Sequence, residues 1–271
     1  MPKLKIKIIG FPGWHIECST MSSKYLGLPL DIHGGGKDLI FPHHEDEIAQ
    51  AEGATENKFC NYWMHGEFIL INDEKMAKSV GNIISARDAV KKYGGKALRY
   101  FLMSSHYRTE INFTEDSIKS AKNTMNKLID FVDKIKEVDP KGDYNEKLRE
   151  KVDETRKKFE ASLDDDFNMP LALAAIFDLV NETNRTIDEK KASRKNMKEV
   201  YDLMMDLDKV LGVLEHEKGE LPKEIMDLIF KREGYRKRGD FAAADKIRME
   251  INEKGYIVED SPQGPRWKKI K

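Results

Sequence analysis

Residues 31–50 read DIHGGGKDLIFPHHEDEIAQ, and this order predicts a strand, a glycine turn and then a helix. The strand begins near Pro29 and is short and apolar before the three glycines. Pro42 falls near the first turn of the expected helix, where a proline is tolerated because its missing N–H would be unbonded anyway. A second apolar run covers residues 61–71, and residues 3–11 alternate as a strand does. Residues 1–68 are therefore expected to be α/β.

The sequence changes character after Ser117. Six apolar residues recur there at helical spacing on one face: Ile118, Ala121, Met125, Leu128, Val132 and Ile135. With a shorter helix at 85–93, further helices are expected at about 145–163, 170–190 and 194–214, and the long ones predict an antiparallel bundle. After a linker, the tail predicts two helices hinged at 238–240 and two short strands around a Pro-Gln-Gly turn. The expected fold class is thus α/β plus all-α, with a small C-terminal domain.

The composition is that of a highly charged chain. Of its 271 residues, 47 are Lys or Arg and 48 are Asp or Glu. No run approaches the ~18 apolar residues that a membrane-spanning helix needs, and the interrupted N-terminal stretch does not fit a signal peptide. Only two cysteines occur, Cys18 and Cys60, which argues against a disulfide framework. We therefore expect a cytoplasmic location and no membrane partner.

The C-terminal end is basic although the whole chain is nearly neutral. Residues 218–271 hold 14 Lys and Arg against 10 Asp and Glu, grouped in KREGYRKR (231–238) and RWKKIK (266–271). Such a patch suits contact with a polyanion. A solvated helix surface gives the same pattern, and composition alone favours that simpler interpretation.

His43 and Glu47 are four residues apart, so on a helix their side chains lie on one face about a turn apart. This spacing allows one helix to supply two ligands to a metal ion. Charged helices often produce the same pair without a metal, and acids in a first turn also complement the helix dipole. Cys18 follows an apolar run and precedes what we take as a Ser-Thr turn. A cysteine there is more often a small buried apolar residue, yet Cys, His and Glu together match the preferences of zinc.

Two further stretches suit a nucleotide. Gly34, Gly35 and Gly36 would let a backbone approach a ligand closely, although a tight turn is the simpler interpretation. Lys75 and Lys78, in EKMAKSVGN, would neutralise charge on a triphosphate if their loop folded over it. Taken singly, a solvated lysine loop explains this second stretch as well.

These pieces stand in the order and spacing of a known family. PGWHIECS, DIHGGGKDLIFPHHEDEIAQ, NYWMHGEF and KMAKSVGN resemble motifs of the cysteinyl-tRNA synthetases, which are class I aminoacyl-tRNA synthetases. LRYFLMSSHYR, DDDFNMPLALAAIFDL and the tail from residue 240 resemble that family too. The resemblance covers roughly residues 12–271 and is highly specific. It implies the second half of a Rossmann-like catalytic domain, followed by the bundle and a small C-terminal domain.

The resemblance also implies a set of roles. In this family a zinc ion binds the thiolate of the substrate cysteine, which distinguishes cysteine from serine because a soft metal prefers sulfur. Cys18, His43 and Glu47 match three of the zinc ligands, and Trp14 and His33 match residues lining the cysteine and adenylate pocket. Gly34, Gly35, Gly36 and Asp38 are the expected nucleotide-binding positions. Lys78 matches the second lysine of the Lys-Met-Ser-Lys-Ser loop, which stabilises the phosphates of ATP with Mg²⁺, and Lys75 is its partner.

The implied partners are tRNA(Cys), cysteine and ATP. We expect residues 1–68 to be the C-terminal part of the catalytic domain with the zinc ligands, and 69–115 to be the lysine-loop connecting region. Residues 116–216 would be a tRNA-binding bundle, and 217–271 an anticodon-binding domain.

The chain departs from the family in three places. It contains no His-x-Gly-His signature and lacks the first half of the nucleotide fold with its fourth zinc ligand, a cysteine whose place Cys60 does not match. Residues 1–11 do not resemble the segment that usually precedes the first motif, so we expect an artificial or frameshifted start. Ala77 stands where the lysine loop usually has serine, a change small enough to leave both lysines placed.

The missing first half leads us to expect no amino-acid activation, poor solubility, or both, unless a separate N-terminal half is supplied. Two other functions stay open. One is a tRNA-binding paralogue without catalysis, against which the intact Cys18, His43, Glu47 and lysines argue. The other is a ligase that joins cysteine to an aminosugar, against which the bundle and tail argue.

Overall fold

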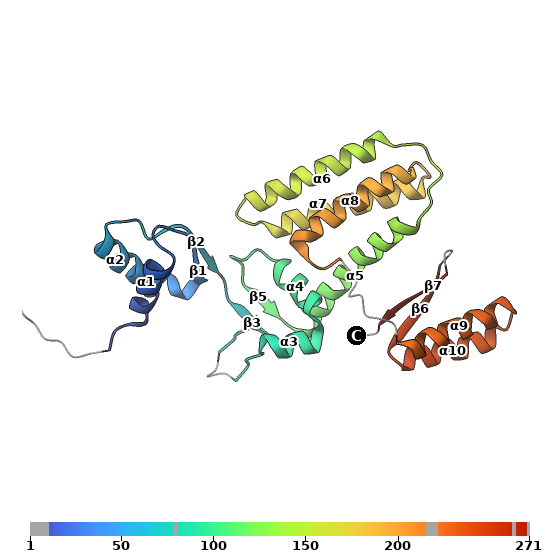
Figure 1. Cartoon of the computed structure of the whole chain (residues 1–271), viewed down its shortest axis with the longest axis horizontal. Coiled ribbons are helices and arrows are strands. Elements are labelled where there is room, and N and C mark those ends of the chain that lie inside the picture. Colours follow the sequence, from blue (N-terminus) through green and yellow to red (C-terminus); the bar gives the residue numbers. More distant parts are fainter. Residues whose placement is uncertain (1–10, 78–80, 215–221, 262–263, 270–271) are drawn as a thin grey trace, which may run out of the picture. The chain divides into compact units, whose positions relative to one another are not determined.

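The computed structural model describes residues 11–77, 81–214, 222–261 and 264–269 (Figure 1). The described chain forms two compact units. The first runs to Ile83 and includes Ser105–Thr114, and the second comprises Ile84–Ser104 and the chain from Glu115 onward. All but the last residue of the expected strand at 3–11, and most of the linker at 215–222, lie outside the described residues.

The first unit is built on a parallel pair of strands joined by a helix. Strand β1 (Leu30–Gly36) pairs with β2 (Cys60–Gly66), in register from Leu30 opposite Cys60 to Gly36 opposite Gly66. Between them, a short 3₁₀ turn (Lys37–Leu39) and a π-helical turn (Ile40–His44) lead into α2 (Glu45–Thr55). Leu30, Ala51, Phe59 and Cys60 form the small apolar core under this crossover.

The three glycines do not form the turn that we expected. They are the last residues of β1, and each is paired with β2. Gly35 explains why glycine is needed here, because a Cβ at this position would lie 2.9 Å from both the His44 ring and a methyl group of Leu39. The strand therefore continues to Gly36, and the turn begins at Lys37.

The expected Ser-Thr turn after Cys18 is also wrong, because Cys18 lies inside α1 (Trp14–Tyr25). Serine is a weak helix former, but Ser19 and Ser23 turn their hydroxyls back to the helix or to a neighbour. The hydroxyl of Ser23 donates to the carbonyl of Ser19, one turn earlier. This kind of local bond lets Ser and Thr remain inside a helix.

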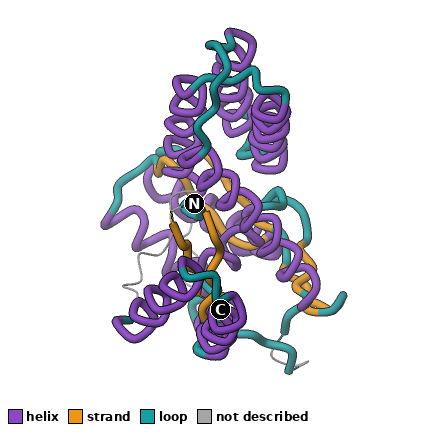
Figure 2. The backbone as a smooth tube through the Cα atoms, turned by 90° about the vertical axis from the view of Figure 1, so that its right-hand side faces the viewer, coloured by secondary structure: helices purple, strands orange, loops and turns teal. Residues whose placement is uncertain are grey.

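A second sheet in the first unit has the order β4-β3-β5, with β3 (Ile69–Ile71) in the middle, β4 (Glu74–Lys75) antiparallel and β5 (Ile111–Phe113) parallel to it. Asn72 and Asp73, both with positive φ, form the two-residue turn between β3 and β4, as expected for residues that tolerate the left-handed region. Figure 2 shows how small the sheets of the described chain are, in orange.

The second unit is helical, and side-chain caps mark where its helices begin. The short helices α3 (Ala86–Tyr93) and α4 (Gly95–Met103) precede the long α5 (Glu115–Glu137). The helices α6 (Glu146–Asp164), α7 (Met169–Asp188) and α8 (Arg194–Leu211) then run side by side (Figure 1). Asn145 and Asn168 cap α6 and α7, and Ser193 with Asn196 forms a capping box on α8. Each such cap contributes roughly 1 kcal/mol.

The periodicity of α5 is confirmed. All six residues expected on its apolar face are buried, together with Phe131. The facing helices contribute side chains that are almost fully buried, among them Leu148 of α6, Leu179 of α7 and Leu203 of α8. Each such burial stabilises the fold by roughly 1.5–3 kcal/mol relative to an exposed side chain, so the bundle has a closed core of its own.

The C-terminal segment has the predicted elements. Helices α9 (Lys223–Lys237) and α10 (Phe241–Glu253) flank the expected hinge, and β6 (Tyr256–Ser261) pairs antiparallel with β7 (Gly264–Lys269). A separate core of Ile225, Ile229, Ile247, Ile251, Tyr256 and Val258 holds them together. Arg232 is buried beside this core and makes two hydrogen bonds to Asp260, at 2.8 and 3.0 Å.

The expected fold class, α/β followed by all-α, is confirmed. Among the described residues, none of the helices is long and apolar enough to cross a membrane.

Candidate metal centre

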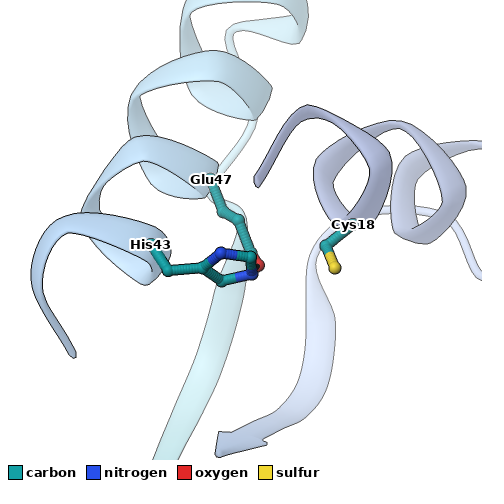
Figure 3. A group of neighbouring side chains, drawn as sticks. All are labelled: Cys18, His43 and Glu47. Carbon is teal, nitrogen blue, oxygen red and sulfur yellow. Dashed lines mark ion pairs between the residues drawn. The ribbon is translucent and has the colours of Figure 1, made fainter. Parts of the chain in front are cut away.

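Three side chains from different elements converge in the first unit. Cys18 comes from α1, His43 from the π-helical turn and Glu47 from the first turns of α2 (Figure 3). The π-helical turn is continuous with α2, so His43 and Glu47 keep the one-turn spacing predicted from the sequence. Cys18 reaches them because α1 packs against α2.

The donor atoms of the three residues lie within 4.8 Å of one another. The Nε2 atom of His43 is 2.7 Å from one carboxylate oxygen of Glu47, and the Nε2 atom of His33 is 2.8 Å from the other. Glu47 is fully buried, and its oxygens make these two close contacts with histidine nitrogens but no hydrogen bond of regular geometry. A buried carboxylate is costly unless hydrogen bonds or positive charge compensate it, so a cation shared by these side chains would stabilise this arrangement.

The donor set fits zinc. Thiolate sulfur, imidazole nitrogen and carboxylate oxygen are the three ligand types that zinc takes in proteins, and catalytic zinc usually has three protein ligands and one open position. Cys18, His43 and Glu47 supply one of each. Because a bound cation would satisfy the Glu47 oxygens, the orphaned carboxylate itself supports this assignment.

Without a cation, the surroundings of Cys18 disfavour its thiolate. Burial, then the charge of Glu47 and a contact with it, raise the pKa of the Cys18 thiol above its ordinary value. A metal ion reverses this effect because it stabilises the deprotonated sulfur directly. Binding at this position is therefore expected to release a proton.

A cluster of histidines beside this group was missed from the sequence. His44 is buried, and its Nδ1 lies 2.8 Å from Nε2 of His65 on β2. Burial, with the nearby charges of His33, His65 and His43, lowers the pKa of His44 to about 4, so it is neutral near pH 7. Burial and Arg108 also lower the pKa of His65. His33, His44 and Glu47 form a second group of potential metal ligands.

His44 follows His43 directly on the helix expected from Pro42, so its side chain is expected to point elsewhere than the His43–Glu47 pair. Its ring contacts His65 of β2, a tertiary contact that local spacing does not reveal. The signal that could have found the cluster is the strand NYWMHG, in which Trp63 and His65 point to the same side. The ring of Trp63 lies 5.0 Å, centroid to centroid, from those of both His33 and His44.

The other expected pocket residues lie near this cluster to different degrees. Trp14 stands 4.5 Å, ring to ring, from His43, although 63% of Trp14 is exposed. His33 contacts Glu47 directly. Gly34 and Gly36 lie in the last part of β1. A Cβ at Gly36 would lie 2.5 Å from a carboxylate oxygen of Asp38. Asp38 is exposed and lies outside the groups of potential metal ligands.

Of the two lysines expected at the phosphates, the structure places one. Lys75 ends β4 with its side chain exposed, and its Nζ lies 3.7 Å from the centroid of the Phe68 ring. The side chain of Asn82 accepts from the N–H of Ala77 and donates to the carbonyl of Lys75, which fixes the base of this loop. Lys78 lies outside the described residues.

The second unit has a groove of about 490 Å³ between α6 and α8. Its charged lining is mixed and contains Arg149, Arg156, Lys209, Asp153, Glu199, Asp202 and Asp206. The opposite charges largely offset one another, and we assign the groove no function.

Three successive parts of the chain match models of protein families. Residues 8–123 match the class I (C) tRNA synthetase catalytic domain, 158–215 match the DALR domain, and 218–267 match the cysteinyl-tRNA ligase anticodon binding domain. Over these ranges the chain is similar to the cysteinyl-tRNA synthetases. Cys18, His43, Glu47 and Lys75 all lie within the part that matches the catalytic domain.

Curated relatives agree. The cysteine–tRNA ligase of Thermococcus gammatolerans is 42% identical over 275 residues, covering 97% of this chain and 58% of the relative. That of Bacillus cytotoxicus is 43% identical over 264 residues, covering 96% and 57%. The chain thus spans somewhat more than half the length of these synthetases.

Solved structures show the same fold at low sequence identity. The LeuRS of Agrobacterium radiobacter, solved in a ternary complex with tRNA and LeuAMS, has a TM-score of 0.55 at 17% identity, covering 71% of this chain and 28% of its own. The methionyl-tRNA synthetase of Mycobacterium tuberculosis, in complex with methionyl-adenylate, has a TM-score of 0.53 at 19% identity, covering 71% and 43%. These similarities concern the fold alone.

Proposed function

We propose that this chain is the zinc-binding and tRNA-binding portion of a cytoplasmic cysteine–tRNA ligase. In the complete reaction, the carboxylate of cysteine attacks the α-phosphorus of ATP and pyrophosphate leaves. The cysteinyl group then passes from the adenylate to a hydroxyl of the terminal ribose of tRNA(Cys), and AMP leaves. The observation that carries the proposal is the convergence of Cys18, His43 and Glu47, with both oxygens of the buried Glu47 lacking a hydrogen bond.

Zinc bound by these three residues would supply a soft Lewis acid that prefers the sulfur of cysteine to the hydroxyl of serine. The chain's own residues prepare the position. His33 contacts Glu47 and helps to fix the orientation of its carboxylate. Trp14, next to His43 and largely exposed, provides an apolar surface against which a small side chain can pack. Neutral His44 and His65 add no positive charge that would repel a cation.

Lys75 and Lys78 are assigned to the phosphates of ATP, which binds with Mg²⁺. Their ammonium groups would stabilise the negative charge that moves onto pyrophosphate as it leaves. Lys75 already has a defined position over Phe68. Gly34, Gly35, Gly36 and Asp38, at the carboxyl ends of the parallel strands, are assigned to the nucleoside, because open parallel sheets bind ligands at that edge.

The remaining parts are assigned to tRNA(Cys). The helical bundle, residues 116–216, would hold its body, and the C-terminal domain, residues 217–271, would reach its anticodon. The basic side chains at the C-terminal end of α9, Arg236, Lys237 and the capping residue Arg238, suit contacts with phosphate oxygens. Such contacts fix the position of the RNA without reading its sequence.

Activation of cysteine would require a complementary N-terminal half. Ile32 on β1 and Tyr62 on β2 are register partners on one face of the parallel sheet, and they are 60% and 70% exposed. Parallel sheets are normally covered on both faces. A separate chain with the His-x-Gly-His signature would cover this face and complete the nucleotide site.

ATP–pyrophosphate exchange with cysteine tests the proposal. The purified chain is assayed alone with zinc, and then with the N-terminal half of a cysteine–tRNA ligase added in trans. Exchange in the mixture and not in the chain alone is the expected result. Tight binding of tRNA(Cys) without exchange in either sample would instead favour a tRNA-binding protein without catalysis.

A further inference from the structure

A series of polar contacts joins α1 to α2 beside the candidate metal centre. The hydroxyl of Ser19, which is 4% exposed, lies 2.8 Å from Oε1 of Gln50. The Nε2 atom of Gln50 lies 2.5 Å from Nδ1 of His15, and Nε2 of His15 lies 3.5 Å from a carboxylate oxygen of Asp46. Gln50 therefore bridges two residues of α1, and Asp46 closes the series on α2.

The donors and acceptors of this series are mutually consistent. Asp46 accepts, so it favours the tautomer of His15 with its proton on Nε2. The Nδ1 atom of His15 is then free to accept from the amide nitrogen of Gln50. The amide oxygen of Gln50 accepts from the hydroxyl of Ser19. An amide can donate and accept at once, whereas a carboxylate at position 50 would lose the donor.

The series is important because α1 has little apolar packing to fix its register. Ser19 is the one buried residue of α1, a helix that the structure describes in full. Several of its apolar residues are exposed: Trp14 at 63%, Ile16 at 39% and Met21 at 45%. A helix held this weakly by apolar contacts needs directional bonds to fix its rotation and translation on a neighbour.

The position of Cys18 depends on that register. His43 and Glu47 belong to one continuous helical segment, so their relative position is set locally. Cys18 alone comes from α1, and it lies between His15 and Ser19, the two residues that Gln50 contacts. A shift of α1 by about 1 Å would move the sulfur away from the shared metal position, and ligand sites tolerate roughly half that error.

We propose that Gln50 is a positioning residue that fixes the register of α1 on α2 and thereby holds Sγ of Cys18 at the metal shared with His43 and Glu47. The proposal rests on the zinc centre of the preceding section. Gln50 does not touch the metal; it acts through Ser19 and His15.

Cobalt substitution tests this without any assay of catalysis. Co²⁺ is titrated into the metal-free chain, and two signals are recorded: the visible d–d bands, which report any bound cobalt, and the near-ultraviolet thiolate-to-cobalt band, which reports Cys18. The wild-type chain is compared with Gln50→Leu, with the isosteric Gln50→Glu, and with Glu45→Gln as a control at an exposed position of the same helix.

Gln50→Leu is expected to lower cobalt affinity roughly tenfold, the usual effect of removing an outer hydrogen-bonding partner. It should also lose most of the thiolate band per bound cobalt, with an unchanged helical circular dichroism spectrum. Gln50→Glu should lose part of the band, and Glu45→Gln should match the wild type. If Gln50→Leu fails to fold, Gln50→Glu and Ser19→Ala give the same comparison.

The outcomes distinguish a failure of the proposed zinc centre from a failure of the proposed role of Gln50. No thiolate band in the wild-type chain would overturn the proposed zinc centre, and this inference with it. A wild-type band that persists unchanged in Gln50→Leu and Gln50→Glu, at unchanged affinity, would leave the zinc centre intact and overturn the role of Gln50. A loss of d–d and thiolate bands in equal proportion would reduce Gln50 to a general stabiliser and also contradict the proposal.

Discussion

The α/β unit and the helical bundle differ in how completely they bury their apolar side chains. The bundle closes its core: Leu128, Leu179 and Met204 are completely buried, and side-chain caps fix its helix starts. The α/β unit leaves Ile32, Phe41 and Tyr62 open, at 60%, 76% and 70% exposure. In that unit the fully buried carboxyl group of Glu47 contacts two histidine nitrogens and makes no hydrogen bond of regular geometry.

This difference separates residues that stabilise the fold from residues that serve chemistry. The bundle has the apolar burial that a stable fold needs. The α/β unit instead concentrates buried polar groups around Glu47, and among its described residues Ile32 and Tyr62 form an exposed apolar face. Sites for chemistry generally retain features that cost stability, so the first unit should respond to metal and to a complementary chain, whereas the bundle should not.

The largest expected effect comes from shortening one buried side chain of the bundle. Leu179→Ala should destabilise the bundle by about 3 kcal/mol because it leaves a cavity. The matched change Ile32→Ala, on the open face, should alter local stability by less than about 0.5 kcal/mol. Hydrogen exchange with mass spectrometry measures each segment separately. Equal losses from both changes would show that the two regions do not differ as described.

The second effect concerns the two cysteines. Cys18→Ala should weaken zinc binding roughly 100-fold, because each ligand supplies a substantial share of the binding free energy. Cys60→Ala is the matched control, since Cys60 is buried in the apolar core and lies outside the group of potential ligands. Competition with a chromophoric chelator measures both affinities. A similar loss in both variants would exclude Cys18 as a specific ligand.

The C-terminal domain differs from both the α/β unit and the bundle, because its buried charged residue, Arg232, has a partner. Asp260→Asn should destabilise this domain by about 2 kcal/mol, since hydrogen bonds to the buried Arg232 are weakened. Hydrogen bonds from Arg232 lower the pKa of Asp260 below its ordinary value. Its contribution is therefore present above the unfolded pKa, near 4, and is lost as the pH falls further.

Hydrogen exchange of residues 223–258 at pH 7 and at acid pH measures this contribution. The wild-type domain should lose stability below about pH 4, and Asp260→Asn should lose less because its contribution is already absent. Asp227→Asn, at an exposed position of α9, is the control. An unchanged acid dependence in Asp260→Asn would show that another carboxylate is responsible.

The smallest effect is expected at the surface of the bundle. Hydrogen bonds from Lys209 and Arg156 lower the pKa of Asp206 to about 2. Asp206 is half-buried and its two basic partners are exposed, so water screens these ion pairs. Asp206→Asn should therefore change the stability of the bundle at pH 7 by less than the error of a urea titration. A small loss of wild-type stability between about pH 4 and pH 2 should disappear in this variant, because the lowered pKa contributes only above that range. A large loss at pH 7 would mean that surface charges, and not the closed core, stabilise the bundle.

The sequence predicts those features that local spacing determines. The apolar face of α5 and the pairing of His43 with Glu47 follow from 3.6 residues per turn. The position of Cys18 does not, because it depends on how α1 packs on α2 over a separation that no local rule covers. We expected a turn after Cys18, and only the tertiary contacts of Ser19 show why a helix forms there.

Local spacing does not predict the histidine cluster or the contacts of Gln50 either, because both depend on tertiary packing. His44 reaches His65 because a π-helical turn and the absence of a side chain at Gly35 bring its ring against the strand. Gln50 looks like an ordinary polar helix residue until His15 and Ser19 are seen beside it. Family resemblance supplied the role of zinc, but the orphaned oxygens of Glu47 are a property of this chain's structure.

The most direct test of the zinc centre is X-ray absorption at the zinc edge, on the purified chain with and without free cysteine. We expect one sulfur neighbour at about 2.3 Å, from Cys18, with nitrogen and oxygen neighbours at about 2.0–2.2 Å. Added cysteine should raise the count to two sulfurs, and added serine should leave it at one. A zinc ion with no sulfur neighbour, or a spectrum that cysteine leaves unchanged, would contradict the assignment of this site to cysteine recognition.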